Sequence, residues 1–235
     1  MEVSLPSFSD MTWFALNFIG DSGSVLLADL YFTTQEVVVT GPSIAAPVPS
    51  VIDGDNVIVL YSDSLAQDRW ISVWNANWWN APQYAEGNVG GDNFAKYQIT
   101  DGGTEGGVAG LEFGFEIGVL NANSTTTWNF DLYVEPGISK ISFQLVSADG
   151  SSSYVINNPP AGLWTHYAIN YDSMTDNDGD GPGVMSQGAL QAAGLQLWGL
   201  SGKAIYMDNI YFSGEAVFHE VAVTVRGNQN QLLAG

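Results

Sequence analysis

The chain has 235 residues, of which 25 are acidic and 5 are basic, so its formal net charge is −20 at pH 7. This charge opposes binding to nucleic acid and to anionic membranes, and we exclude both as partners. Hydrophobic residues make up 46% of the chain, and cysteine is absent. The composition therefore allows a sizeable buried core but excludes disulfides and thiol chemistry.

Residues 1–39 contain two predicted strands around the turn Gly-Asp-Ser-Gly, and a similar hairpin recurs at residues 194–212. LADLYF at residues 27–32, for example, matches MDNIYF at residues 207–212. A repeat this local indicates that residues 1–39 are the tail end of a preceding, truncated module. The start at Met1, with EVSLPSFSD after it, is typical of a piece excised from a longer chain.

The rest of the chain is predicted to be a linker, one complete module and a tail. Residues 40–50, TGPSIAAPVPS, predict an extended Pro-rich linker. The complete module is predicted at residues 51–215, and residues 216–235 are a C-terminal tail or the start of a next segment. Strands are expected at residues 57–62, 70–74, 96–100, 111–117, 126–134, 141–147, 164–171, 194–200 and 205–212. These short strands, separated by Gly, Asn and Asp turns, predict an all-β, two-sheet β-sandwich of the jelly-roll type, with the N-terminal hairpin as an addition.

The segment WISVWNANWWNAPQY at residues 70–84 contains five aromatic side chains and no charge. Adjacent tryptophans cannot both face inward from a regular strand, so at least one of Trp78 and Trp79 is expected at the surface. Exposed tryptophan among amides suits the apolar face and the hydroxyl rim of a sugar ring. The alternative is that these rings cap the core beneath a loop.

An ordered set of segments resembles a known family. APVPSVIDGDNVIVLYSDSLAQD, WISVWNANWW, FAKYQI, GLEFGF, TWNFDLYV, ISFQLVSADG, LWTHYAINY and IYMDNIYF follow one another between residues 46 and 212. This order is similar to that of the C-terminal carbohydrate-binding modules of bacterial laminarinases and related polysaccharide-binding surface proteins. The resemblance implies a jelly roll that binds β-glucan without chemistry, within a multimodular protein that is secreted or held at the bacterial cell surface.

Alternation within three predicted strands suggests a face for the sugar. At residues 127–134, Trp128, Phe130, Leu132 and Val134 are expected to face the core, and the intervening side chains to face outward. The outward side chains of this strand and two others are amides, a carboxylate and rings, which can stack on a pyranose and bind its hydroxyls. Together with the aromatic segment, the candidate carbohydrate-binding residues are Trp74, Trp78, Trp79, Tyr84, Asn129, Asp131, Tyr133, Gln144, Gln196 and Trp198. Trp74 is expected to lie beneath the others, and the alternative is an ordinary solvated face.

Two groups of acidic residues are candidate calcium ligands. DNDGDG at residues 176–181 places Asp176, Asp178 and Asp180 at the first, third and fifth positions of an EF-hand-like loop, although Pro182 and Gln187 depart from that pattern. The family resemblance further suggests a structural Ca²⁺ where Asp63 and Asp208 meet at one end of the sandwich. The alternative for both groups is simple turn capping.

The segment LEFGFEI at residues 111–117 is the best enzymatic alternative. Glu112 and Glu116 are expected on one strand face, in a spacing that resembles the E-x-D-x-E strand of family 16 glycosidases. Two carboxylates flanking a glycosidic bond are what retaining hydrolysis needs, but Gly114 replaces the middle acid. We therefore predict a non-catalytic carbohydrate-binding module with a β-glucan-type, laminarin-like ligand. A glycosidase using Glu112 and Glu116, and a structural or adhesive sandwich without a sugar ligand, are the alternatives.

Overall fold

The computed structural model describes residues 41–50, 56–100, 107–176 and 181–214. The chain divides into two compact units, Met1–Val37 and Val38–Gly235. The predicted hairpin of residues 1–39 and the predicted tail of residues 216–235 lie outside the described residues. In the part of the chain that is described, no helix has the length and hydropathy required to span a membrane.

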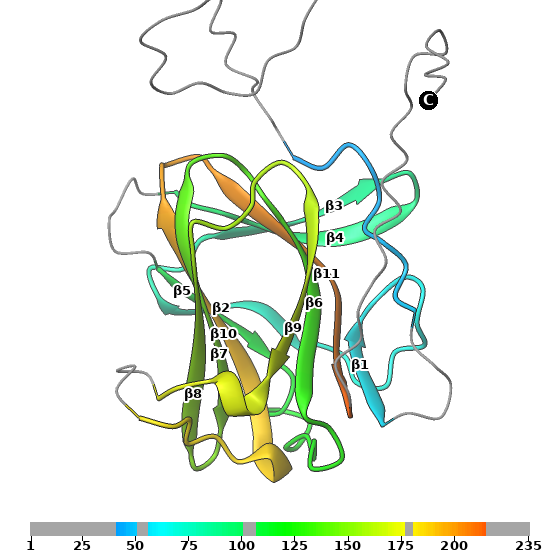
Figure 1. Cartoon of the computed structure of the whole chain (residues 1–235), viewed down its shortest axis with the longest axis vertical. Helices are drawn as coiled ribbons and strands as arrows, with labels where there is room; N and C mark the ends of the chain where they lie inside the picture. The colour runs from blue at the N-terminus through cyan, green and yellow to red at the C-terminus, as the bar shows by residue number, and fades with distance from the viewer. Residues whose placement is uncertain (1–40, 51–55, 101–106, 177–180, 215–235) are drawn as a thin grey trace, which may run out of the picture. The chain divides into compact units, whose positions relative to one another are not determined.

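The described strands form two antiparallel sheets that pack face to face (Figure 1). Sheet A has the strand order β3-β4-β11-β6-β9, with β1 also pairing with β11. Its strands are β1 (Val57–Tyr61), β3 (Gln83–Val89), β4 (Asp92–Gln98), β6 (Thr127–Val134), β9 (Trp164–Asn170) and β11 (Ala204–Ser213). The predicted two-sheet β-sandwich is confirmed.

Sheet B has the strand order β2-β5-β10-β7-β8. Its strands are β2 (Val73–Trp79), β5 (Val108–Glu112), β7 (Ile138–Ser147), β8 (Gly150–Asn157) and β10 (Leu190–Gly199). Two 3₁₀ turns, η1 (Tyr171–Ser173) and η2 (Gln187–Ala189), lie in the connection between β9 and β10. In both sheets most neighbouring strands are far apart in the sequence, so the sheets are assembled from long-range pairings.

The core lies between the sheets and is built from alternate residues of each strand. Trp128 and Phe130 of β6 are fully buried there, and Phe143 of β7 faces them from sheet B. The ring centroids of Phe130 and Phe143 lie 4.4 Å apart. Burying a large apolar side chain stabilises a fold by about 1.5–3 kcal/mol. The inward-facing half of the predicted alternation in β6 is confirmed.

Segment 41–50, predicted as a linker, lies along the outer face of sheet A. The indole Nε1 of Trp164 donates a hydrogen bond to the carbonyl of Ile44 at 2.9 Å. The backbone N–H of Ala46 donates to Oδ2 of Asp92 at 2.8 Å. Ala46 also packs into a second apolar cluster with Phe94, Tyr133, Trp164, Ala204 and Tyr206. The segment therefore covers aromatic side chains that sheet A would otherwise expose.

The prediction that the outward side chains of β6 are available to a sugar is wrong. Asn129, Asp131 and Tyr133 point away from the main core, but they are 0%, 0% and 5% exposed. Tyr133 lies in the cluster beneath Ala46, and Asn129 donates to Ser213 Oγ at 2.9 Å. Alternation predicts the side of a strand on which a residue lies, but it does not reveal whether another segment covers that side.

Candidate functional site

The outer face of sheet B carries most of the predicted aromatic and amide residues. In β10, Leu195 and Leu197 enter the core, so the residues between and beside them face outward. Gly194 pairs with Gly110 of β5 and Gln144 of β7, whereas Gln196 pairs with Val108 and Ser142. Trp198 pairs with Lys140. These pairings bring Gln144, Gln196 and Trp198 together on one face, as predicted.

Trp78 lies flat across this face. The ladder between β2 and β5 shifts register between Asn77 and Trp79, and Trp78 is the extra residue at this bulge. A side chain at Gly110 would overlap the indole of Trp78, and a Cβ at Gly194 would lie 3.2 Å from its Cζ3. The two paired glycines therefore form a flat seat for the indole, which is 37% exposed.

Glu112 fixes the orientation of this ring. The Trp78 Nε1 donates a hydrogen bond to Oε1 of Glu112 at 3.1 Å. Trp79, at the end of the same strand, is 50% exposed. The prediction that at least one of the adjacent tryptophans reaches the surface is confirmed, because the bulge allows both to do so.

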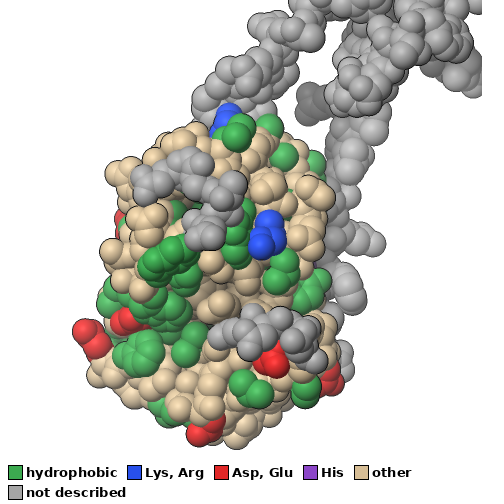
Figure 2. Space-filling model, turned by 90° about the vertical axis from the view of Figure 1, so that its left-hand side faces the viewer, with side chains coloured by type: hydrophobic (Ala, Val, Ile, Leu, Met, Phe, Trp, Pro, Cys, Tyr) green, Lys and Arg blue, Asp and Glu red, His purple; other side chains and the backbone are tan. Residues whose placement is uncertain are grey.

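Trp198 stands farther along β10, four residues from Gly194, which corresponds to about 13 Å at strand rise. The Lys140 Nζ lies 3.6 Å from the centroid of the Trp198 ring. Figure 2 views the side on which sheet B lies in Figure 1, and hydrophobic side chains gather across it. Trp78 and Trp198 thus border a strip that contains Gln144, Gln196 and Ser142.

Trp74 and Tyr84 lie elsewhere, at the margin of the main core. Their rings stack at a centroid distance of 5.8 Å, and Tyr61 meets Trp74 edge-on at 4.9 Å. The hydroxyl of Tyr97 donates to the Trp74 carbonyl at 2.6 Å. Trp74 is therefore structural, as expected, but it packs on the main core rather than beneath the exposed rings. Tyr84 belongs with Trp74, so these two candidates for the sugar site lie away from Trp78, Trp79 and Trp198.

The predicted pair of catalytic carboxylates is not formed by one strand. The strand predicted at residues 111–117 ends at Glu112, and Glu116 lies in an exposed turn. Phe113 still donates its N–H to the Gln191 carbonyl at 3.0 Å, and a Cβ at Gly114 would meet the Gln191 backbone at 2.6 Å. β5 has ended before this close approach and a turn follows it, so the expectation that Glu112 and Glu116 share a strand face is wrong.

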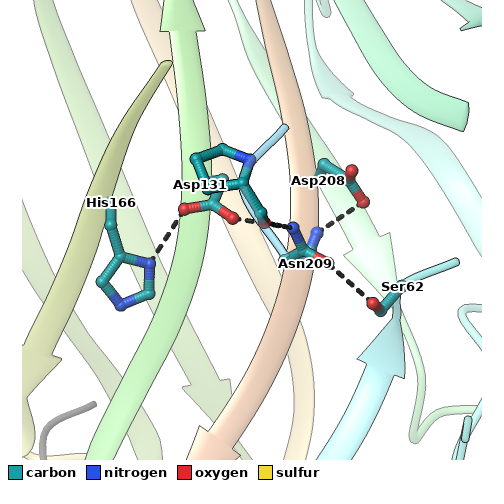
Figure 3. Close-up of polar contacts among 6 residues, drawn as sticks. Ser62, Asp131, His166, Asp208 and Asn209 are labelled. Carbon is teal, nitrogen blue, oxygen red and sulfur yellow. Dashed lines mark hydrogen bonds and ion pairs between the residues drawn. The ribbon is translucent and has the colours of Figure 1, made fainter. Parts of the chain in front are cut away.

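A buried polar network centred on Asp131 and Asn209 joins sheet A to segment 41–50 (Figure 3). Asn209 has a φ of +48° at a bulge in β11, and its Nδ2 donates to Asp131 Oδ2 at 2.7 Å and to the Pro47 carbonyl at 2.9 Å. Its Oδ1 accepts a hydrogen bond from Ser62 at 2.6 Å. Asp131 Oδ1 also lies 2.9 Å from Nδ1 of His166. Asp131 is therefore committed to structural partners, which corrects its prediction as a sugar ligand.

Asp208 lies beside this network and is fully buried. Its Oδ1 accepts the Asn209 N–H at 2.6 Å, while its Oδ2 has no hydrogen-bond partner among the described residues. Burial, followed by the nearby charges of Asp92, Asp131 and Asp63, raises the pKa of Asp208 to about 8. Unfavourable burial of a carboxylate of this kind is what a bound cation would relieve.

The two predicted calcium sites differ in how much of each is described. Asp63 contributes to the electrostatic environment of Asp208, and it accepts hydrogen bonds from Asn93, with a 2.6 Å contact to the backbone N–H. Asp176 closes the base of its loop by donating its N–H to the Gly181 carbonyl at 3.1 Å. Asp178 and Asp180 lie outside the described residues. No cluster of three or more His, Cys, Asp or Glu side chains with metal-binding geometry occurs among the described residues.

Comparisons with known proteins yield similar solved structures. No protein-family model matches the chain, and no curated protein matches it. The chain is similar to a family 11 carbohydrate-binding module from Clostridium thermocellum, in complex with a β-1,3-1,4-mixed-linked tetrasaccharide, at 15% identity and a TM-score of 0.48. That match covers 69% of this chain and 98% of the module.

An arginine-to-alanine variant of a family 29 carbohydrate-binding module is similar at 16% identity and a TM-score of 0.42. The match covers 67% of this chain and 91% of that one. At such identities, the function of this chain has to be argued from its own residues.

Proposed function

We propose that the outer face of sheet B binds a β-glucan-type, laminarin-like polysaccharide without cleaving it. The observation that carries this proposal is the position of Trp78, which lies flat on the Gly110–Gly194 pair and is held by Glu112. An indole seated in this way presents its outer face to solvent. A sugar ring can stack on such a face with its apolar C–H groups while its hydroxyls project sideways.

Polar groups for those hydroxyls lie beside the indole. Gln144 lies next to Gly194, with its Oε1 3.0 Å from the position of a Cβ at that glycine, and Gln196 follows two residues along β10. Each sugar hydroxyl exchanges a hydrogen bond to water for one to protein, so the net gain per bond is small. We therefore expect dissociation constants between the micromolar and the millimolar range, with most of the affinity coming from the rings.

The arrangement of carboxylates supports binding rather than hydrolysis. Glu112 is engaged by the indole of Trp78, and Glu116 lies in an exposed turn after the strand has ended. Retaining and inverting glycosidases need two carboxyl groups that face each other across the scissile bond.

We further propose that the chain belongs to a larger multimodular protein that is secreted or held at the bacterial cell surface.

Titration of laminarin into the protein by calorimetry tests this proposal. Trp78→Ala and Trp79→Ala should each weaken binding by roughly 1–3 kcal/mol, and Trp79→Ala, at the more exposed ring, should leave thermal unfolding unchanged. Trp74→Ala is the matched control, and it should lower the free energy of unfolding by up to about 3 kcal/mol. If the unfolding temperature drops equally in all three variants, the rings belong to the core and the sugar site lies elsewhere.

Two further outcomes separate the alternatives. Release of reducing sugar from laminarin that disappears in Glu112→Gln would favour the glycosidase. Absence of binding to laminarin, mixed-linkage glucan, agarose, alginate and xylan would favour the structural or adhesive sandwich.

A further inference from the structure

The ammonium group of Lys140 lies at one end of the proposed glycan-binding surface, the outer face of sheet B. Lys140 pairs with Trp198 across the β7–β10 ladder, and its Nζ lies 3.6 Å from the Trp198 ring centroid. A cation over an aromatic face is attracted by the ring quadrupole. The contact therefore holds the charge at a defined position before any ligand arrives, which lowers the entropic cost of using it in binding.

This ammonium group forms no ion pair with a carboxylate among the described residues. Lys96 and Lys203 likewise form no ion pair among the described residues, so Lys140 is distinguished by its contact with Trp198 on the outer face of sheet B. An ammonium group has three donors, and the Trp198 ring occupies only one side of it. The remaining donors are available to a ligand on the outer face of sheet B.

Glu112, the acid that binds Trp78 on this face, lies too far along the strands to neutralise Lys140. Glu112 pairs with Ala192, and Lys140 pairs with Trp198 on the same strand. Six residues of strand correspond to about 20 Å, which exceeds two Debye lengths of about 8 Å at physiological salt. Lys140 and Glu112 therefore lie at opposite ends of the stretch of β10 that their two strands pair with. The same screening limits the repulsion between a ligand anion at Lys140 and distant acids of the chain.

We propose that the polysaccharide bound by this face carries an anionic substituent, a carboxylate or a sulfate ester, which Lys140 holds beside Trp198. Sugar rings without charge stack on Trp78 at the other end of the strip. The ammonium group is a compact point charge and suits either anion, without the planar geometry that a guanidinium requires. This inference rests on the proposed function of sheet B and adds a chemical class to the ligand.

Three probes with one backbone test the inference: laminarin, carboxymethyl-laminarin and sulfated laminarin, titrated into the whole chain by calorimetry. The wild type should bind at least one charged derivative about two- to fivefold more tightly than laminarin, the range for an exposed ion pair. The derivative that gains affinity distinguishes a carboxylate from a sulfate. Lys140→Met should remove this preference and leave the affinity for laminarin unchanged, because methionine retains an apolar contact with the ring.

Lys96→Met is the matched control, since the Lys96 Nζ lies 5.9 Å from the Tyr206 ring on sheet A. That variant loses the same charge and should keep the preference. Equal binding of all three probes by the wild type, or a preference retained in Lys140→Met, overturns the inference and leaves the proposed function intact. Binding of none of the three probes overturns both. Thermal unfolding of each variant shows whether the fold is preserved.

Discussion

At the scale of single residues, Asp208 departs strongly from the chemistry of a solvated side chain. Its folded-state pKa is raised from 3.8 to about 8, chiefly by burial. The Asp208 carboxyl therefore binds more protons in the folded chain than in the unfolded chain at every pH between these two values. Under this condition, the free energy of unfolding falls as the pH rises.

We predict that, in the presence of a chelator, the wild type unfolds at a lower temperature at pH 8 than at pH 5 because of Asp208. Asp208→Asn has no charge to bury and retains an oxygen that can accept the Asn209 N–H. The difference in melting temperature between the variant and the wild type should therefore increase from pH 5 to pH 8. Calorimetric scans at both values measure it, and a difference that does not change with pH would contradict the prediction.

At the scale of strands, the glycine pair beneath Trp78 is the feature on which the site depends. Gly110 and Gly194 oppose each other on adjacent strands, and the bulge in β2 brings the indole over them. A methyl group at Gly110 would overlap this ring, whereas the backbone conformation of Gly110 is one that alanine can adopt. A substitution by alanine at Gly110 should therefore move the ring rather than destabilise the sheet.

Gly110→Ala should displace the indole and weaken laminarin binding by roughly 1–3 kcal/mol, the contribution expected of one ring. A double-mutant cycle with Trp78→Ala, followed by calorimetric titration, isolates the mechanism. If Gly110 acts through the ring, Gly110→Ala has little further effect in the Trp78→Ala background. Additive losses would mean that the glycine serves another purpose.

Prediction from the sequence succeeded for strands with strong alternation and failed for polar edge strands. Strong alternation located β6 and the inward face of β10, but β3 and β8 were missed. Both are edge strands with polar sequences, QYAEGNV and GSSSYVIN, because an edge buries little. A strand was predicted at residues 70–74, but the strand in this region is β2, Val73–Trp79. The periodicity of the sequence does not reveal the bulge at Trp78 that lets β2 continue to Trp79.

The placement of the candidate site residues on one face was predicted in part, for a related reason. Trp78, Trp79, Gln144, Gln196 and Trp198 share the outer face of sheet B because each faces away from the core or lies at a bulge. Asn129, Asp131 and Tyr133 have the same pattern in sheet A, where all three are buried. Tyr133 packs beneath segment 41–50, Asp131 accepts a hydrogen bond from Asn209, and Asn129 donates one to Ser213. Gly110 and Lys140 carried no local signal, because their roles depend on a neighbouring strand.

At the scale of the whole molecule, we propose that Ca²⁺ stabilises the fold. The unpartnered Oδ2 of Asp208 and the raised pKa of this carboxyl fit a hard cation nearby, with Asp63 as a second ligand. A site that exists only in the folded state stabilises by about 2.7 kcal/mol when calcium is present at a hundred times its dissociation constant. A second candidate site includes Asp176, with Asp178 and Asp180 outside the described residues.

Addition of calcium to chelator-treated protein should raise the melting temperature, and differential scanning fluorimetry measures the shift. Asp208→Asn should abolish the increase if the first site is responsible, whereas Asp176→Asn should abolish it if the loop is responsible. A melting curve that calcium leaves unchanged, with the metal content checked by elemental analysis, would remove both sites.

Segment 41–50 has a mechanical consequence for a chain under tension. Its backbone groups at Ile44, Ala46 and Pro47 hydrogen-bond to side chains of sheet A and the β11 bulge, namely Trp164, Asp92 and Asn209. These single bonds, rather than a continuous ladder of backbone hydrogen bonds, hold the segment in place. We expect a pull on its N-terminal end to load these attachments one after another, so that the segment detaches before a strand leaves its sheet. Its 10 residues would then extend to about 34 Å. The segment would lengthen under the pulling force while sheet B stays folded and its outer face stays bound to a polymer.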